Sequence, residues 1–154
     1  MDEPLVETWL IHDRINRYLL DAVPRGALEA VSASKGRTVG EQFAHLHNVR
    51  LMWLKAAAPD LLDGLDKLDK GQPLEPKTLA RALDASGRAI AELVARSAAG
   101  GGKVKGFKPH VTAFVGYLIS HESHHRGQIA LTLKQSGHPL DRKVAYGLWE
   151  WGVR

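Results

Sequence analysis

Apolar residues recur at helical spacing in four long segments of this 154-residue chain, and proline or glycine separates each segment from the next. Within each segment they return every three or four positions, which places them on one face of a helix. No stretch alternates apolar and polar residues as a half-buried strand does. The pattern therefore predicts an all-α fold, and the simplest arrangement is an antiparallel-type four-helix bundle. The segments cover about residues 3–22, 39–58, 76–98 and 109–136.

Short-range signals indicate where these helices begin and end. Thr38, with Glu41 three positions later, has the spacing of a capping box, so the second helix is expected to begin directly after Thr38. Pro76 and Pro109 suit the first turns of the third and fourth helices, where the missing N–H has no helical partner to lose. Gly137 is typical of the residue that ends a helix.

The connections between the helices differ in length. Residues 24–37 are punctuated by Gly, Ser and Pro and are expected to form an irregular link. Residues 59–75 are also expected to be irregular, with a short helical turn around residues 61–68. The C-terminal tail carries Trp149 and Trp151, for which packing against the core is a better interpretation than a dimer contact.

Composition narrows the class of protein. The chain is 44% hydrophobic and 25% charged, as expected for a single soluble domain covering residues 1–154. The N-terminus is acidic and has no signal-peptide pattern, and no apolar run approaches the ~18 residues of a membrane span, so we expect a cytoplasmic protein. The net charge is +4, but the basic residues are scattered. Even the densest group, Lys103, Lys105 and Lys108, is more typical of a solvated loop than of a nucleic-acid site.

The fourth predicted helix contains the motif with the clearest chemistry. Residues 121–128 read His-Glu-Ser-His-His-Arg-Gly-Gln, and His121 and His125 lie one helical turn apart on the same face. Two imidazoles placed in this way can share one metal ion. Pairs of this kind also arise by chance in a chain with eight histidines, but here the surrounding face is largely apolar. Buried imidazoles need partners, so metal ligation is the favoured interpretation.

A third ligand has to come from another helix. The chain has no cysteine, so the remaining ligands are restricted to His, Asp, Glu or water. The second predicted helix offers His45 and His47, which point about 200° apart around the helix axis and cannot both face one site. The periodicity leaves both histidines open as candidates.

Other polar residues near the pair are candidates for supporting roles. His124, Arg126 and Gln128 lie close enough to contact a ligand or a bound anion, although ordinary surface contacts are equally compatible with the pattern. Glu122 occupies the general-base position of the HExxH metalloprotease pattern. It lies about 100° from His121 around the helix, so it can equally well face solvent or another helix.

A protease is the weakest of the enzymatic interpretations. Metzincins require Gly and His three and six residues after the second histidine, where this chain has Gln128 and Leu131. Glu150 is a distant acidic candidate for the third ligand, but it lies in a Trp-rich segment that is typical of packing. The isolated histidines His12, His110 and His138 are expected to be structural or exposed.

The two histidine-bearing helices carry motifs that resemble the DinB superfamily of DNA-damage-inducible, YfiT-like metalloproteins. The stretch Thr38–Leu46 looks like the helix-two motif of that family, and His121–Ile129 looks like its helix-four motif. The closing segment Tyr146–Trp151 is similar to the tails of some members. The resemblance implies an up-down-down-up four-helix bundle, often dimeric, that holds zinc, nickel or a similar divalent ion. It also implies that His45, rather than His47, joins His121 and His125 as a metal ligand.

The expected function is metal-dependent chemistry on a small molecule. The resemblance implies a thiol-dependent transferase or isomerase that uses a low-molecular-weight thiol such as bacillithiol or mycothiol, and a hydrolase fits the same centre. A metal ion would lower the pKa of a bound water or thiol. The sequence identifies no catalytic side chain. The alternative is a non-enzymatic bundle that binds a small ligand and carries a structural metal.

Overall fold

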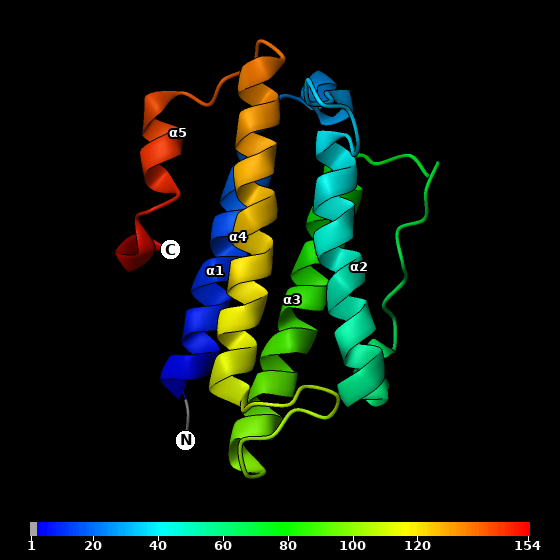
Figure 1. The fold of residues 1–154 in the computed structure, drawn as a ribbon, viewed down its shortest axis with the longest axis vertical. Coiled ribbons are helices and arrows are strands. Elements are labelled where there is room, and N and C mark those ends of the chain that lie inside the picture. The colour runs from blue at the N-terminus through cyan, green and yellow to red at the C-terminus, as the bar shows by residue number, and fades with distance from the viewer. Residues whose placement is uncertain (1–2) are drawn as a thin grey trace.

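A computed structural model of the protein describes residues 3–154 as a bundle of four long helices with a short helical tail (Figure 1). No β-strand occurs within that range, where the only β pairings are two isolated bridges. The all-α prediction is therefore confirmed. The long helices are α1 (Glu3–Ala22), α2 (Val39–Ala57), α3 (Pro76–Ala99) and α4 (Val111–Gln135), the tail helix is α5 (Arg142–Gly147), and the short 3₁₀ helices are η1 (Arg25–Glu29), η2 (Pro59–Leu62) and η3 (Trp151–Val153).

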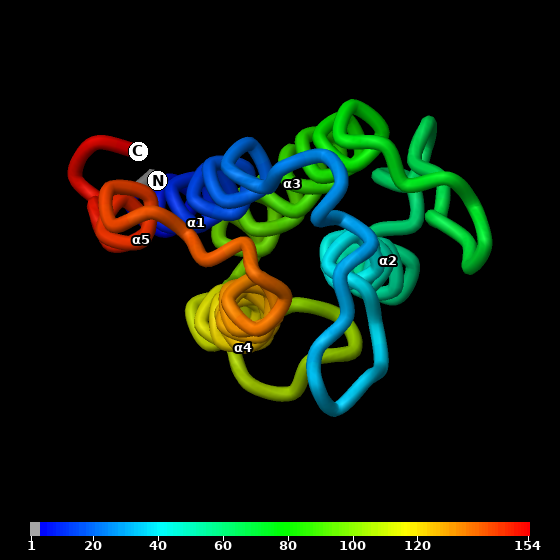
Figure 2. The backbone as a smooth tube through the Cα atoms, turned by 90° about the horizontal axis from the view of Figure 1, so that it is seen from above, coloured from blue at the N-terminus to red at the C-terminus, as the bar shows by residue number. Residues whose placement is uncertain are grey.

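The helices follow an up-down-down-up order, as the family resemblance implied. In Figure 1, α1 rises, α2 and α3 descend, and α4 rises again. Two consecutive parallel helices need a long crossover. Residues 58–75 supply it, running along the outer side of α2, and its only helical turn is η2, earlier than the predicted turn at residues 61–68. Seen along the bundle in Figure 2, α3 lies beside α1 and α2 while α4 faces them from the other side.

The capping predictions are confirmed in part. The Thr38 hydroxyl accepts a bond from Glu41 N–H and the Glu41 carboxylate accepts one from Thr38 N–H, which completes the capping box. Gly137 has φ +83, the left-handed conformation that favours glycine at the end of a helix. The fourth helix begins at Val111 rather than Pro109, because the His110 side chain accepts a bond from Ala113 N–H and acts as its N-cap.

The core consists of two clusters stacked along the bundle axis. Large side chains with no exposed surface fill both, and burying each one contributes about 1.5–3 kcal/mol. The upper cluster includes Phe43, Leu46, Leu79, Leu83 and Ile129, and the lower one includes Trp9, Leu54, Ile90, Phe114 and Leu118. A set of polar side chains lies buried as well, and its members are described with the site below.

The aromatic tail does not pack as predicted. Trp149 is 80% exposed and Trp151 is half-buried, so core packing was the wrong interpretation for Trp149. The four long helices fill the space between them, and α5 lies against the outside of the bundle (Figure 2). The tail is held by Leu140 and Leu148, which pack against the core, and by Arg154, whose guanidinium lies 3.7 Å from the centre of the Tyr18 ring. No helix within residues 3–154 is long and apolar enough to cross a membrane.

Candidate metal centre

Three imidazoles meet where α2 faces α4. His45 comes from α2, and His121 and His125 come from successive turns of α4. One ring nitrogen from each residue lies within 4.8 Å of the other two. The centre of the His45 ring lies 4.5 Å from the centre of the His125 ring and 5.3 Å from that of His121. The centres of the two α4 rings are 4.8 Å apart. Such a cluster can hold one metal ion.

The other candidate ligand, His47, faces away from this cluster. It is buried, and its Nε2 lies 2.7 Å from the carbonyl oxygen of Asp66 in the crossover, to which it donates. His47 therefore ties the crossover to α2. The geometry selects His45 as the residue that joins the α4 pair, which periodicity alone did not decide.

A glutamine on α2 orients one of the three rings. The Nδ1 atom of His125 lies 2.7 Å from Gln42 Oε1 and 3.1 Å from Gln128 Oε1. Both partners are amide oxygens, which only accept, so Nδ1 carries the hydrogen. The Nε2 atom of His125 consequently keeps its lone pair. Fixing the tautomer through the second ring nitrogen is the usual way in which proteins prepare a histidine for a metal.

All three rings are neutral near pH 7. Burial, followed by the repulsion that His45 and His121 exert when they are protonated, lowers the pKa of His125 from 6.5 to about 4. Burial, followed by the charge of Arg37, lowers the pKa of His45, and burial lowers that of His121. A neutral imidazole is the form that binds a metal ion, so protons compete weakly for these ligands.

The donor set fits a divalent transition metal. The three donors are nitrogen atoms, and the Nδ1 atom of His121 is buried without a hydrogen-bond partner among the described residues. A buried polar atom without a partner is costly unless something else, such as an ion, satisfies the ring. Imidazole nitrogens suit zinc, nickel, cobalt and iron, and three of them leave a further position for water or substrate.

Glu122 lies on a different face of α4, in a separate polar network. It is completely buried, and its carboxylate accepts bonds from Arg50 Nε at 2.8 Å, Arg50 Nη2 at 2.7 Å and Asn16 Nδ2 at 2.8 Å. His12 Nε2 lies 3.0 Å away, and Arg50 also forms an ion pair with Asp13. Burial by itself raises the pKa of Glu122, but the charge and hydrogen bonds of Arg50 outweigh it and hold that pKa at about 2. The carboxylate is therefore ionised and fully engaged.

Comparison with known proteins gives the family and the fold of this chain. The DinB family model matches residues 1–149. The chain belongs to the DinB family. A crystal structure of a DinB-like protein from Bacillus cereus aligns with a TM-score of 0.66 at 21% identity, covering 90% of this chain and 94% of that one. This likeness shows the shared fold. No curated protein sequence matches this DinB chain.

The residues considered for supporting roles in this DinB protein fall into two groups. Gln128 contacts His125, and its Nε2 lies 3.1 Å from Nε2 of the exposed His124. Within the part of the chain that the structure describes, Glu122 and Arg126 form no hydrogen bond with the three imidazoles. Arg126 donates to Asn16 Oδ1 at 2.6 Å and so belongs to the buried network.

Sequence reasoning missed two polar residues of α2, Arg50 in the buried network and Gln42 beside the histidine cluster. Arg50 is completely buried, and its position four residues before the buried Leu54 and seven after Phe43 places it on the core stripe of α2. Gln42 lies three residues before His45 and therefore shares its side of the helix. Extending the helical-wheel analysis from apolar to polar residues would have found both.

Proposed function

We propose that this DinB family protein is a metal-dependent enzyme whose ion is held by His45, His121 and His125. The observation that carries the proposal is the convergence of three imidazole nitrogens within 4.8 Å of one another. Neutral rings, a fixed His125 tautomer and a His121 nitrogen that has no partner among residues 4–154 all favour an ion there. Zinc or nickel is the metal we propose, because nitrogen ligands suit both.

The ion would supply Lewis acidity and so favour an anionic nucleophile, water or thiol, at neutral pH. The protein residues hold and orient the ligands. Gln42 keeps the proton of His125 on Nδ1. Glu122 is not available as the proton acceptor of a protease, because Arg50, Asn16 and His12 occupy its carboxylate. Thiol-dependent transfer, isomerisation or small-molecule hydrolysis is therefore better supported than proteolysis.

The substrate we propose is a small molecule, with a low-molecular-weight thiol as the second reactant. Three neutral imidazoles leave the whole charge of a divalent ion uncompensated, which favours a thiolate over a neutral ligand. We propose a homodimer as the working assembly, because the resemblance to the DinB superfamily implies one.

Metal analysis of purified variants tests the ligand set. We expect one equivalent of zinc or nickel in the wild-type protein and in His47→Ala. In His45→Ala and His125→Ala, the metal content should fall below about a tenth of that value. The His47→Ala variant is the matched control, because that residue lies on the same helix two positions away. Full stoichiometry in His45→Ala would contradict the proposal.

A kinetic panel separates an enzyme from a bundle with a structural metal. The metal-loaded protein should accelerate addition of a small thiol to an electrophile, or hydrolysis of a small ester or amide. The His45→Ala variant should lose that acceleration while staying folded. Absence of turnover across the panel, together with full metal occupancy, would favour the structural role.

A further inference from the structure

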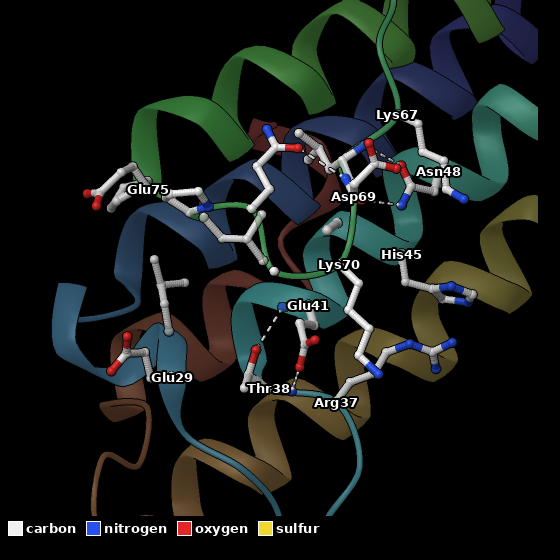
Figure 3. Close-up of a pocket in the computed structure, with 18 of the residues that line it drawn as sticks. Glu29, Arg37, Thr38, Glu41, His45, Asn48, Lys67, Asp69, Lys70 and Glu75 are labelled. Atoms are coloured by element: carbon white, nitrogen blue, oxygen red, sulfur yellow. Dashed lines mark hydrogen bonds between the residues drawn. The ribbon is translucent and has the colours of Figure 1, made fainter.

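An open cavity reaches the candidate metal centre from the side of the crossover. It encloses about 1310 Å³ between the α1–α2 connection, the first half of α2 and residues 67–76. Of the three imidazoles, His45 is the one that lines it. Its position makes the cavity an approach route to the histidine cluster (Figure 3).

The charges along the cavity wall are distributed unevenly. In Figure 3, Arg37 and Lys70 extend toward the side on which His45 lies, whereas Glu29 and Glu75 lie at the opposite end. Arg37 and Lys70 thus place positive charge at the end of the cavity that leads to the metal centre, and the carboxylates of Glu41 and Asp69 also line the cavity.

Arg37 and Lys70 lack a counter-ion within the part of the chain whose side chains the structure describes. Within residues 4–154 neither forms an ion pair, whereas Arg25, which lines the same cavity, is paired with Glu75. The carboxylate of Glu41, which also lines the cavity, accepts a bond from Thr38 N–H in the capping box of α2 and forms no ion pair with either cation within residues 4–154. Two exposed cations that face one cavity without a carboxylate partner are well placed to bind an anion.

Arg37 and His45 line the same cavity, and Figure 3 shows both side chains at one end of it. Arginine offers a planar fork that matches carboxylate or phosphate, and lysine adds a point charge on a flexible stem. Arg126, the cation that the sequence placed nearest the motif, is instead occupied by Asn16 in the buried network.

We propose that Arg37 and Lys70 form a subsite for an anionic group, carboxylate or phosphate, of the small molecule whose reacting end reaches His45, His121 and His125. The claim that the reacting end reaches the three histidines rests on the proposed metal-dependent function. The anion subsite itself is a property of the cavity. The substrate class it defines is a small acid or phosphate ester, as opposed to a neutral or cationic compound.

Calorimetry with matched thiols tests the subsite in the zinc-loaded protein. The probes are mercaptocarboxylates of three and six carbons, each compared with the mercapto-alcohol of the same chain length. We expect the acid of at least one length to bind about 3- to 10-fold more tightly than its alcohol. Arg37→Gln and Lys70→Gln should reduce that ratio toward one and leave alcohol binding unchanged. Arg25→Gln is the matched control and should keep the wild-type ratio.

A second titration needs no metal. Inorganic phosphate added to the metal-free protein should shift the backbone amide resonances around residues 37 and 70 in nuclear magnetic resonance spectra, and the Arg37→Gln, Lys70→Gln double variant should lose the shifts. If the protein binds no metal but shows these shifts, the subsite stands and the metal-dependent function falls. Metal binding with no acid preference and no phosphate shifts would overturn the subsite alone.

Discussion

Helix α4 presents two polar regions, and they are satisfied to very different degrees. On one side, Glu122 is completely buried and meets Arg50, Asn16 and His12 at hydrogen-bonding distance. On the other, His121 is half-buried and its Nδ1 has no partner in the described part of the chain. Adjacent residues of one helix thus differ: the Glu122 carboxylate is fully paired, whereas the His121 ring keeps an unpaired nitrogen.

The difference distinguishes a network suited to a structural role from a cluster suited to binding a ligand. A buried charge is tolerated only when its partners are in place, and removing one partner leaves the others costly. The Arg50–Glu122 network therefore holds α1, α2 and α4 together. The histidine cluster lacks such completion, which suits a site that receives an ion. Variants of the two regions test this contrast.

The largest expected effect comes from breaking the buried network. Arg50→Met leaves the carboxylates of Glu122 and Asp13 without their cation, so the free energy of unfolding should fall by about 3–5 kcal/mol. His45→Ala in the metal-free protein should change it by less than about 1 kcal/mol. Urea denaturation measures both, and similar losses in the two variants would remove the distinction between the regions.

Acidification should destabilise the protein through the same network. The unfolded chain protonates Glu122 near pH 4.5 and the folded one only near pH 2, so its contribution is complete above pH 4.5 and is lost as the pH falls toward 2. Burial lowers the pKa of His12, so this residue also destabilises the folded protein as the pH falls below 6.5. Burial raises the pKa of Asp13, so acidification stabilises the folded protein through that residue.

We expect Glu122 to lower the free energy of unfolding by roughly 3 kcal/mol between about pH 5 and pH 2, since one pKa unit corresponds to about 1.4 kcal/mol. Urea midpoints measured across this range provide the check. Glu122→Gln cannot titrate, so its stability should depend less steeply on pH in that window. An equally steep dependence in this variant would show that other groups dominate.

The histidine side of the contrast can be sharpened through Gln42. Gln42→Leu removes the nearer of the two acceptors of His125 Nδ1–H and leaves only Gln128 Oε1 at 3.1 Å, so metal affinity should fall about 10- to 100-fold while the fold persists. Gln42→Glu keeps an acceptor oxygen and should retain wild-type affinity. Competition with a chelator gives the affinities, and nitrogen NMR of His125 reports its tautomer. If the tautomer and the affinity both survive in Gln42→Leu, Gln42 does not position the ligand.

The smallest effects are expected from two glycines. A Cβ at Gly87 of α3 would lie 2.5 Å from Asp13 Oδ2 in the network, so Gly87→Ala should destabilise by about 1–2 kcal/mol. A Cβ at Gly116 of α4 meets nothing within 4 Å, and Gly116→Ala should stabilise by about 0.5–1 kcal/mol. The unfolding temperature should fall in Gly87→Ala and rise in Gly116→Ala. Equal changes in the two variants would show that Gly87 is not tightly packed against Asp13.

Much of the site was predictable because its signals are local. The i, i+4 spacing of His121 and His125 placed them on one face, and the capping box placed the start of α2. The failures have a common cause. Pro109 was taken as the helix start because the sequence does not reveal that His110 bonds back to Ala113. Trp149 was assigned to the core because apolar character does not reveal that the core is already full.

The sequence by itself determined four helices, their apolar faces and a histidine pair with metal-ligand spacing, because periodicity and caps act within a few residues. Only the tertiary structure decided that Gln42 meets His125, that Arg50 engages Glu122 and that Arg37 and Lys70 face the cavity at His45. These contacts join segments far apart in the chain, and the relative rotation and height of packed helices set them. Burial then determines whether a polar side chain is held by partners or left free to bind.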